Sequence, residues 1–189
     1  MSILKPTPVV LCLALVLAGC GHSPPTRFYT LDALPPATSP AYAGPALRIG
    51  QVYVPAVLDR SELVQEMTAG QLKVADFDHW GAPLGQLIRS ALESDLNGRV
   101  PAGKLLPDTG PVPDGGATIM VTVLAVNRTN DGLSMDVTWT RTVTPKPNHP
   151  TTTTQSLRLT SDPVDASAQG YASGLSQMAA RLADAIVAS

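Results

Sequence analysis

The chain has 189 residues, of which 44% are hydrophobic, and carries 13 Lys and Arg against 15 Asp and Glu, for a net charge of −2. This length fits one domain with a sizeable core. The acidic balance argues against a nucleic-acid-binding surface, which would be basic, and against a polybasic patch that binds anionic lipid.

Residues 1–19 have the layout of a secretory signal peptide. Lys5 provides a positive start, and residues 9–17 form an uncharged apolar run that is shorter than the about 20 residues of a transmembrane helix. The tetrapeptide Leu17-Ala18-Gly19-Cys20 resembles a bacterial lipobox, where the thiol is acylated and the chain is cut just before the cysteine. An ordinary cleaved signal with a chance cysteine and an uncleaved anchor are the alternatives.

Acylation of Cys20 would anchor the mature chain, residues 20–189, to a membrane. Each buried methylene contributes about 0.8 kcal/mol, so several acyl chains anchor almost irreversibly. Gly21 replaces the aspartate that retains lipoproteins in the inner membrane of enteric-type bacteria, so we expect the outer membrane, facing the periplasm. Cys12 leaves with the signal peptide, so no thiol remains for a disulfide or a metal, and the lipid on Cys20 is the only attached group predicted.

The segment after the cysteine, residues 20–46, is rich in proline and small residues, which predicts an extended tether. Two adjacent aromatics in residues 27–31 (RFYTL) interrupt this composition. We expect these residues to form a short strand that pins the tether to a sheet. The remaining residues, 47–189, are predicted to form a single α/β domain.

The first half of this domain contains strand patterns and one clear helix. Residues 47–54 predict a strand with a bulge near Gly50. Two further strands are expected to meet at the loop Thr68-Ala69-Gly70. Residues 83–97 place apolar side chains at helical spacing, with Pro83 in the first turn and Gly98 as an end cap.

The second half reads as three strands and a closing helix. Residues 118–126 are apolar on both faces, as in a central strand, and Asn130-Asp131-Gly132 is a hairpin turn signal. Residues 133–140 alternate between apolar and polar, which predicts one buried and one wet face. A polar strand at 151–160 is expected near an edge, and a helix at 168–188. The predicted fold is a two-layer α/β (α+β) sandwich, with an antiparallel-rich sheet of about five or six strands and two helices on one face.

Catalytic motifs are missing from the sequence. It contains no G-x-S-x-G, H-E-x-x-H, P-loop or G-x-G-x-x-G, and its three histidines are scattered. Asp76 and Asp78 would share one face of a strand, where they could hold a divalent cation or serve as paired carboxylates. The interpretation that we favour is an exposed strand end with Phe77 turned inward. We expect a protein that is not an enzyme and binds no metal or cofactor.

Three stretches together resemble a known family. The RFYTL segment follows the lipobox, VYVPAVLDRSELV (52–64) resembles the signature vPxYLDRpxLV, and DFDHWGAPL (76–84) resembles xFxRWaEPL. These signatures are typical of the ABC-type transport auxiliary lipoproteins, the PqiC-like proteins. His79 stands where that family usually has arginine, and Ala82 where it usually has glutamate, so a pair between those two side chains is absent here.

The resemblance implies a set of partner-binding residues. The positions that match the two signatures are Pro55, Leu58, Asp59, Arg60, Trp80, Pro83 and Leu84. Asp59 and Arg60 could instead form an intradomain ion pair or turn contact. Trp80 could fill the core at the start of the helix or anchor an interface.

The resemblance also implies a function. The family serves ABC transport systems for lipids that are built around MCE-type proteins, which form tubes or rings between the membranes. The lipoprotein would dock on an MCE protein and hold it against the membrane, without an ATPase of its own. A lipid-binding carrier and an envelope hydrolase using Asp76 and Asp78 are the alternatives. A homo-oligomer formed through the small-residue helix or the polar edge strand is also open.

Overall fold

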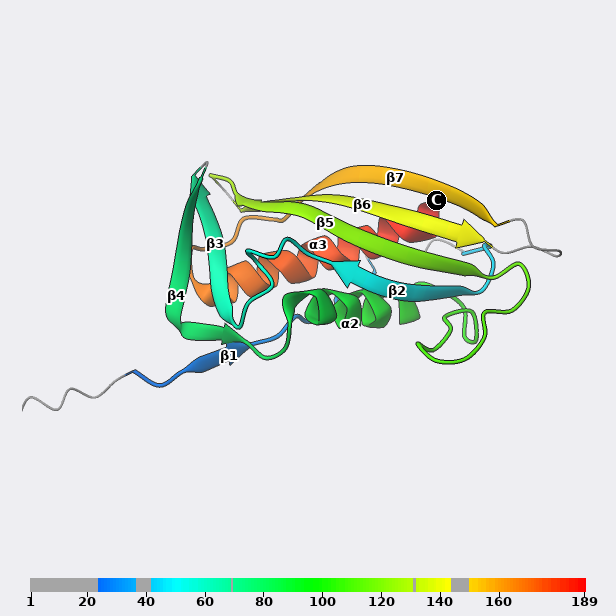
Figure 1. The fold of residues 1–189 in the computed structure, drawn as a ribbon, viewed down its shortest axis with the longest axis horizontal. Helices are drawn as coiled ribbons and strands as arrows, with labels where there is room; N and C mark the ends of the chain where they lie inside the picture. The colour runs from blue at the N-terminus through cyan, green and yellow to red at the C-terminus, as the bar shows by residue number, and fades with distance from the viewer. Residues whose placement is uncertain (1–23, 37–41, 69, 131, 144–149) are drawn as a thin grey trace, which may run out of the picture.

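The computed structural model describes residues 24–36, 42–68, 70–130, 132–143 and 150–189, so the predicted signal peptide and Cys20 lie outside the described residues. Within these residues, seven strands and two helices form an α+β fold (Figure 1). The elements are β1 Arg27–Tyr29, β2 Leu47–Tyr53, β3 Glu62–Thr68, β4 Gln71–Trp80, α2 Leu84–Asn97, β5 Ala117–Arg128, β6 Leu133–Val143, β7 Thr151–Thr160 and α3 Ala168–Ala188.

The sheet is mixed, and its longest ladders are antiparallel. β5 pairs with β6, β6 with β7 and β3 with β4 in antiparallel fashion. β2 and β5 are parallel, and α2 lies in the long crossover that a parallel pair requires. A single bridge, from Glu66 to Asn127, joins the three-stranded part β1-β4-β3 to the part formed by β2, β5, β6 and β7. The predicted α+β class is confirmed, with a strand count close to the five or six expected.

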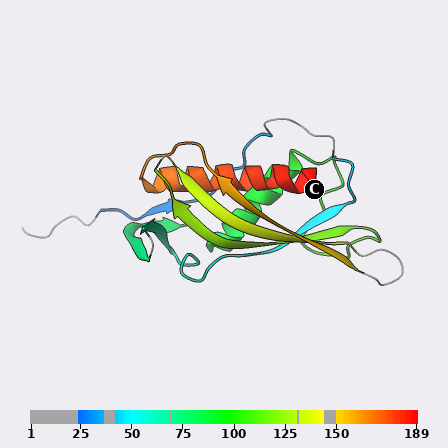
Figure 2. The same ribbon diagram turned by 90° about the horizontal axis from the view of Figure 1, so that it is seen from above.

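Both helices cover the same face of the sheet, as predicted (Figure 2). α2 buries the predicted apolar stripe, and alternate residues of β5 and β6 point toward the helices. The side chains that fill the space between the layers include Leu92, Ile119, Val121, Met135, Val137, Leu175 and Met178, each at most 1% exposed. This alternation is why β6 has one buried and one wet face.

The opposite face of the sheet is open to solvent. On β5, which was expected to be apolar on both faces, Met120 and Leu124 are 42% and 57% exposed. β7 is an exposed edge strand, as predicted, and its Ser156 hydroxyl lies 3.0 Å from that of Thr138 on β6. The pairing of β2 with β5 shifts register between Ile49 and Val52, which confirms the bulge predicted near Gly50.

The β3–β4 hairpin confirms the two strands expected here, although Ala69 in its turn lies outside the described residues. The expected inward orientation of Phe77 is wrong, because this side chain is 38% exposed. The register of the hairpin is irregular between Glu62 and Val64, where several residues of β4 lie opposite one residue of β3. A change of register alters which side chains of a strand face the core.

Residues 27–34 of the predicted tether pack against the fold. β1 pairs in parallel with β4, with Phe28 opposite His79, so the predicted pinning strand is confirmed. Beyond β1, Leu31 is buried and the backbone N–H of Asp32 donates to the hydroxyl of Ser176 on α3 at 3.0 Å. Within the described residues, the packed part of the chain therefore includes residues 27–34, ahead of the domain 47–189 that composition alone suggests.

A buried ionic cluster holds this segment at Leu34. The N–H of Leu34 donates to Asp95 Oδ1 at 2.6 Å, and its carbonyl accepts from Arg99 Nη1 at 3.1 Å. Arg99 also donates through Nε to Asp184 Oδ1 of α3 at 2.6 Å. The side chains of Asp95 and Arg99 are 0% and 1% exposed. Burial raises the pKa of the Asp95 carboxyl despite the attraction of Arg99.

Candidate functional site

Strand pairing brings the two signature segments together. The backbone N–H of Trp80 donates to the carbonyl of Ser61 at 2.7 Å, and Glu62 pairs with His79. The N–H of Gly81 donates to Tyr29 at 2.8 Å, so the RFYTL segment joins the same end of the sheet. Three stretches that are separate in the sequence therefore form one continuous structure.

The first segment turns sharply after β2. The carbonyl of Pro55 accepts from the N–H groups of Leu58 and Asp59, at 2.8 and 3.1 Å. Leu58 is buried at 4% exposure and secures the turn to the core, while Asp59 and Arg60 are exposed. Arg60 Nε lies 3.5 Å from Glu62 Oε2, a surface pair that contributes little to stability.

The second segment ends in the start of α2. Trp80 is 4% exposed, and its ring lies 6.2 Å from that of Tyr171 on α3, with a 40° tilt between the planes. Leu84 is 1% exposed, whereas Pro83 is exposed and its carbonyl accepts from the N–H groups of Gln86 and Leu87. Trp80 and Leu84 therefore hold the segment in the core, and Pro83 lies at the surface of the domain.

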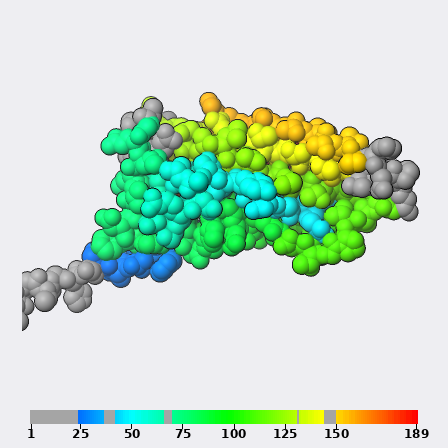
Figure 3. All heavy atoms as spheres, in the orientation of Figure 1, coloured from blue at the N-terminus to red at the C-terminus, as the bar shows by residue number. Residues whose placement is uncertain are grey.

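A polar groove of about 580 Å³ lies where these segments meet β2 and α2. It is lined by Gly50, Gln51, Val52, Asp59, Pro83, Gly85, Gln86, Arg89 and Asp108. Figure 3 shows β2 (cyan) exposed on this side of the molecule. The absence of a side chain on Gly85 permits the close approach of α2 to β2, since a Cβ there would lie 2.7 Å from the carbonyl oxygen of Val52. The groove contains one exposed residue from each signature, Asp59 and Pro83.

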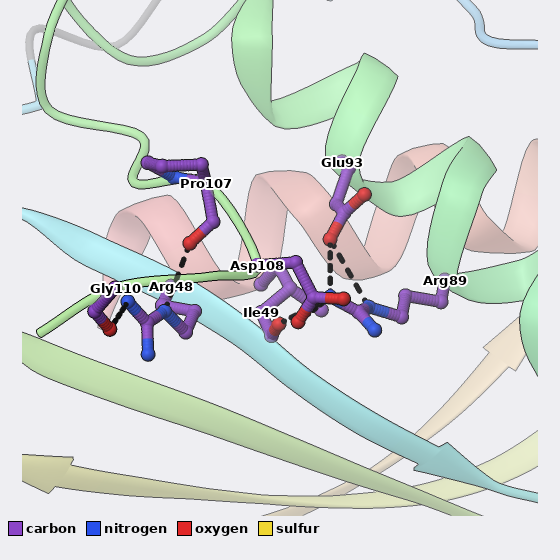
Figure 4. Close-up of polar contacts among 7 residues, drawn as sticks. All are labelled: Arg48, Ile49, Arg89, Glu93, Pro107, Asp108 and Gly110. Carbon is purple, nitrogen blue, oxygen red and sulfur yellow. Dashed lines mark hydrogen bonds and ion pairs between the residues drawn. The ribbon is translucent and has the colours of Figure 1, made fainter. Parts of the chain in front are cut away.

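Arg89 is the charged centre of this groove (Figure 4). Its Nη2 lies 2.7 Å from Asp108 Oδ1 and 3.0 Å from Glu93 Oε1, and it donates to the carbonyl of Ile49 at 3.2 Å. The hydrogen bond from Arg89 lowers the pKa of the Asp108 carboxyl, and that bond also raises the pKa of Arg89. Arg89 thus connects α2, β2 and the loop that carries Asp108.

A second arginine fastens the same loop to β2. Arg48 donates through Nε to the carbonyl of Pro107 at 3.0 Å, and through Nη2 to the carbonyl of Gly110 at 2.7 Å (Figure 4). The wall of the groove formed by this loop is therefore held at three points. The sequence signatures did not reveal Arg48, Arg89 or Asp108, because their contacts join residues far apart in the chain.

The predicted carboxylate pair, Asp76 and Asp78, does not line the groove. Asp78 accepts from Arg27 Nε at 2.7 Å and from the hydroxyl of Tyr29 at 3.1 Å, so it fastens β1 to β4. Asp76 is exposed. Within the described part of the chain, no group of three or more His, Cys, Asp or Glu side chains is arranged to hold a metal ion. No helix in the same residues is long and apolar enough to span a bilayer.

These features define a small α+β domain with a polar groove where β2 meets the start of α2. Comparison with known families places the chain more specifically: the model for the ABC-type transport auxiliary lipoprotein component matches residues 29–187. The chain belongs to this family. The family is an auxiliary component of transport, and its lipoprotein character is consistent with the cell envelope.

Two solved structures share the fold. A crystal structure of an uncharacterised protein is 20% identical, with a TM-score of 0.61, and the match covers 87% of this chain and 98% of the other. Protein XCC0632 from Xanthomonas campestris, described as family DUF330, is 10% identical, with a TM-score of 0.61 and coverage of 85% and 92%. Among curated proteins, no significant match was found.

Proposed function

We propose that this protein is a periplasmic lipoprotein, anchored through acyl chains on Cys20 to the outer membrane, and a non-catalytic auxiliary subunit of an MCE-type ABC transport system for lipids. The support is the family match over residues 29–187 together with the lipobox at Cys20. In this proposal residues 1–19 are the removed signal peptide. The protein contributes to envelope integrity by holding the MCE protein against the membrane.

The observation that carries the docking site is that Asp59 and Pro83, one from each signature, line the same groove. In our proposal the exposed members Asp59, Arg60 and Pro83 contact the MCE protein, with Pro55 at the edge of the turn. The buried members Leu58, Trp80 and Leu84 hold that surface in place. Asp59 offers a carboxylate at the groove, whereas Asp108 is already paired with Arg89, and the Asp59 carboxylate suits a partner that presents arginine or backbone N–H donors.

The docking prediction is tested with Asp59→Lys. We expect this charge reversal to reduce the MCE-type protein that co-purifies with the tagged full chain by at least tenfold, equivalent to about 1.4 kcal/mol of binding free energy. Like charges placed against each other across an interface oppose binding. The measurement is the ratio of the two proteins after purification from detergent-solubilised membranes.

Asp114→Lys is the matched control, because Asp114 is also an exposed acid and lies outside the groove. It should leave the ratio unchanged. If the unaltered chain does not associate with a folded MCE protein, the proposed function is wrong. If it associates and Asp59→Lys binds equally well, the docking surface lies elsewhere and the auxiliary function stands.

The anchor is tested with Cys20→Ser. We expect this variant to lose incorporation of labelled palmitate and to disappear from the outer-membrane fraction, because removal of the acyl chains removes the buried methylene groups that hold the chain there. Cys12→Ser is the control, since it removes a thiol of the signal peptide and should stay with the outer membrane in a density gradient. Incorporation of labelled palmitate into Cys20→Ser, or its retention in the outer-membrane fraction, would contradict lipidation at this residue.

A further inference from the structure

An aromatic face is exposed beside the anchored end of the chain. Phe28 on β1 is 70% exposed, the highest value among the exposed large hydrophobic side chains of the described residues, and Phe77 on β4 is 38% exposed. Phe28 pairs with His79, and their ring centroids are 5.9 Å apart. Phe77 lies two residues before His79 on β4 and is exposed as well, so the rings of Phe28 and Phe77 are both open to solvent on these neighbouring strands.

The opposite side of β1 is occupied. Arg27 and Tyr29 alternate with Phe28 and both contact Asp78, so their side chains bind the domain. Because Arg27 is paired with Asp78 at 2.7 Å, the aromatic face gains no unpaired cation from β1. Its chemistry is therefore mainly aromatic, with the His79 imidazole beside Phe28, and it suits a surface that accepts aromatic rings.

The covalent link to the acylated Cys20 limits how far the aromatic face can lie from the membrane. Phe28 lies eight positions after Cys20, and an extended chain of eight steps spans at most about 28 Å. The contacts of Leu34 with Asp95 and Arg99 keep the chain after β1 attached to the domain, so it adds no length between the domain and Cys20. β1 also lies at one end of the long axis of the molecule, at its surface (Figures 1 and 3).

We infer that Phe28 and Phe77 form a second contact with the lipid bilayer, which rests on the proposed acylation of Cys20. Aromatic side chains suit the boundary between headgroups and acyl chains. Two rings would bind a bilayer weakly alone, but a short tether makes the contact intramolecular and raises its effective concentration to the millimolar range. The contact turns the β1–β4 end of the domain toward the membrane and so fixes its orientation.

The test introduces tryptophan as a reporter in the full, acylated chain. Phe28→Trp and Leu124→Trp are reconstituted in vesicles of phosphatidylethanolamine and phosphatidylglycerol, with and without bromine on the acyl chains. Leu124 is the matched control, since it is 57% exposed on β5, away from β1 in the strand order. The native Trp80 and Trp139 are 4% and 3% exposed and give a constant background.

We expect the emission of the Phe28→Trp reporter to shift to the blue on reconstitution and to fall roughly twofold in brominated vesicles, because interfacial side chains lie about 5–10 Å into the headgroup boundary. Leu124→Trp should emit equally in both vesicles. If the protein floats with the vesicles and Phe28→Trp is quenched no more than the control, the membrane contact is wrong and the anchor stands. If the chain does not float, both the contact and the anchor are wrong.

Discussion

Replacement of Arg99 by methionine is expected to lower the free energy of unfolding by about 3–5 kcal/mol, the usual cost of leaving one charge of a buried pair without its partner. Asp95 is fully buried and forms an ion pair with Arg99, with 3.7 Å between Nη1 and Oδ1. The same change removes the donor to the Leu34 carbonyl. Urea denaturation of the mature domain, followed by circular dichroism, measures the effect.

Asp184→Asn is the control for this substitution. Asp184 also binds Arg99, at 2.6 Å, but its side chain is 39% exposed, so water can solvate what remains. We expect a loss several-fold smaller than that of Arg99→Met. Equal losses for the two variants, or an unchanged midpoint for Arg99→Met, would show that the buried pair does not stabilise the strap formed by residues 27–34.

The pH dependence gives this prediction a second readout. Burial raises the pKa of Asp95 in the folded state, so the folded protein binds this proton more tightly than the unfolded chain, whose Asp pKa is about 3.9. Loss of Arg99 removes an attraction that opposes this shift and raises the pKa further. The difference in stability between Arg99→Met and the unaltered domain should therefore shrink as the pH falls from 7 toward 4. The comparison of two variants cancels the opposite effect of Asp108 and Asp136, whose pKa values are lowered.

The periodic parts of this fold were predictable because their pattern is local. The stripe of α2 and the alternation of β6 each repeat within a few residues, and the structure buries the side chains that the patterns select. The strap cluster has no such signal. Asp95 lies next to the apolar stripe of α2, and its partner Leu34 is 61 residues away. A buried charge pair of this kind is visible only after the two helices and the strap are assembled.

The candidate site was also predictable from the sequence only in part. The signatures located Asp59 and Pro83, but they did not show that both residues line one groove, which results from the pairing of Glu62 with His79. The irregular register of the β3–β4 hairpin also explains why Phe77 was expected inside and is found outside. A strand pattern specifies alternation, and the position of a register shift depends on the partner strand.

Replacement of Trp80 by alanine is expected to lower the free energy of unfolding by about 3–5 kcal/mol, the range typical of truncating a large aromatic side chain in a core. Trp80 is 4% exposed, and its ring packs against Tyr171 of α3, so the substitution leaves a cavity between β4 and the helical layer. Its backbone bond to Ser61 remains available. Thermal and urea denaturation of the mature domain measure the loss.

The same variant distinguishes the two interpretations of Trp80. If Trp80 is a core residue, its substitution lowers stability and reduces partner binding only by unfolding the domain. If Trp80 is an interface anchor, its substitution reduces binding while stability stays constant. Trp80→Phe is the matched control, since it keeps an aromatic ring against Tyr171 and should recover much of the stability. If Trp80→Ala unfolds like the unaltered domain but no longer co-purifies with the MCE protein, the core assignment is wrong and Trp80 acts at the interface. Because its side chain is buried and does not line the groove, we expect stability and binding to fall together, in proportion to the fraction unfolded.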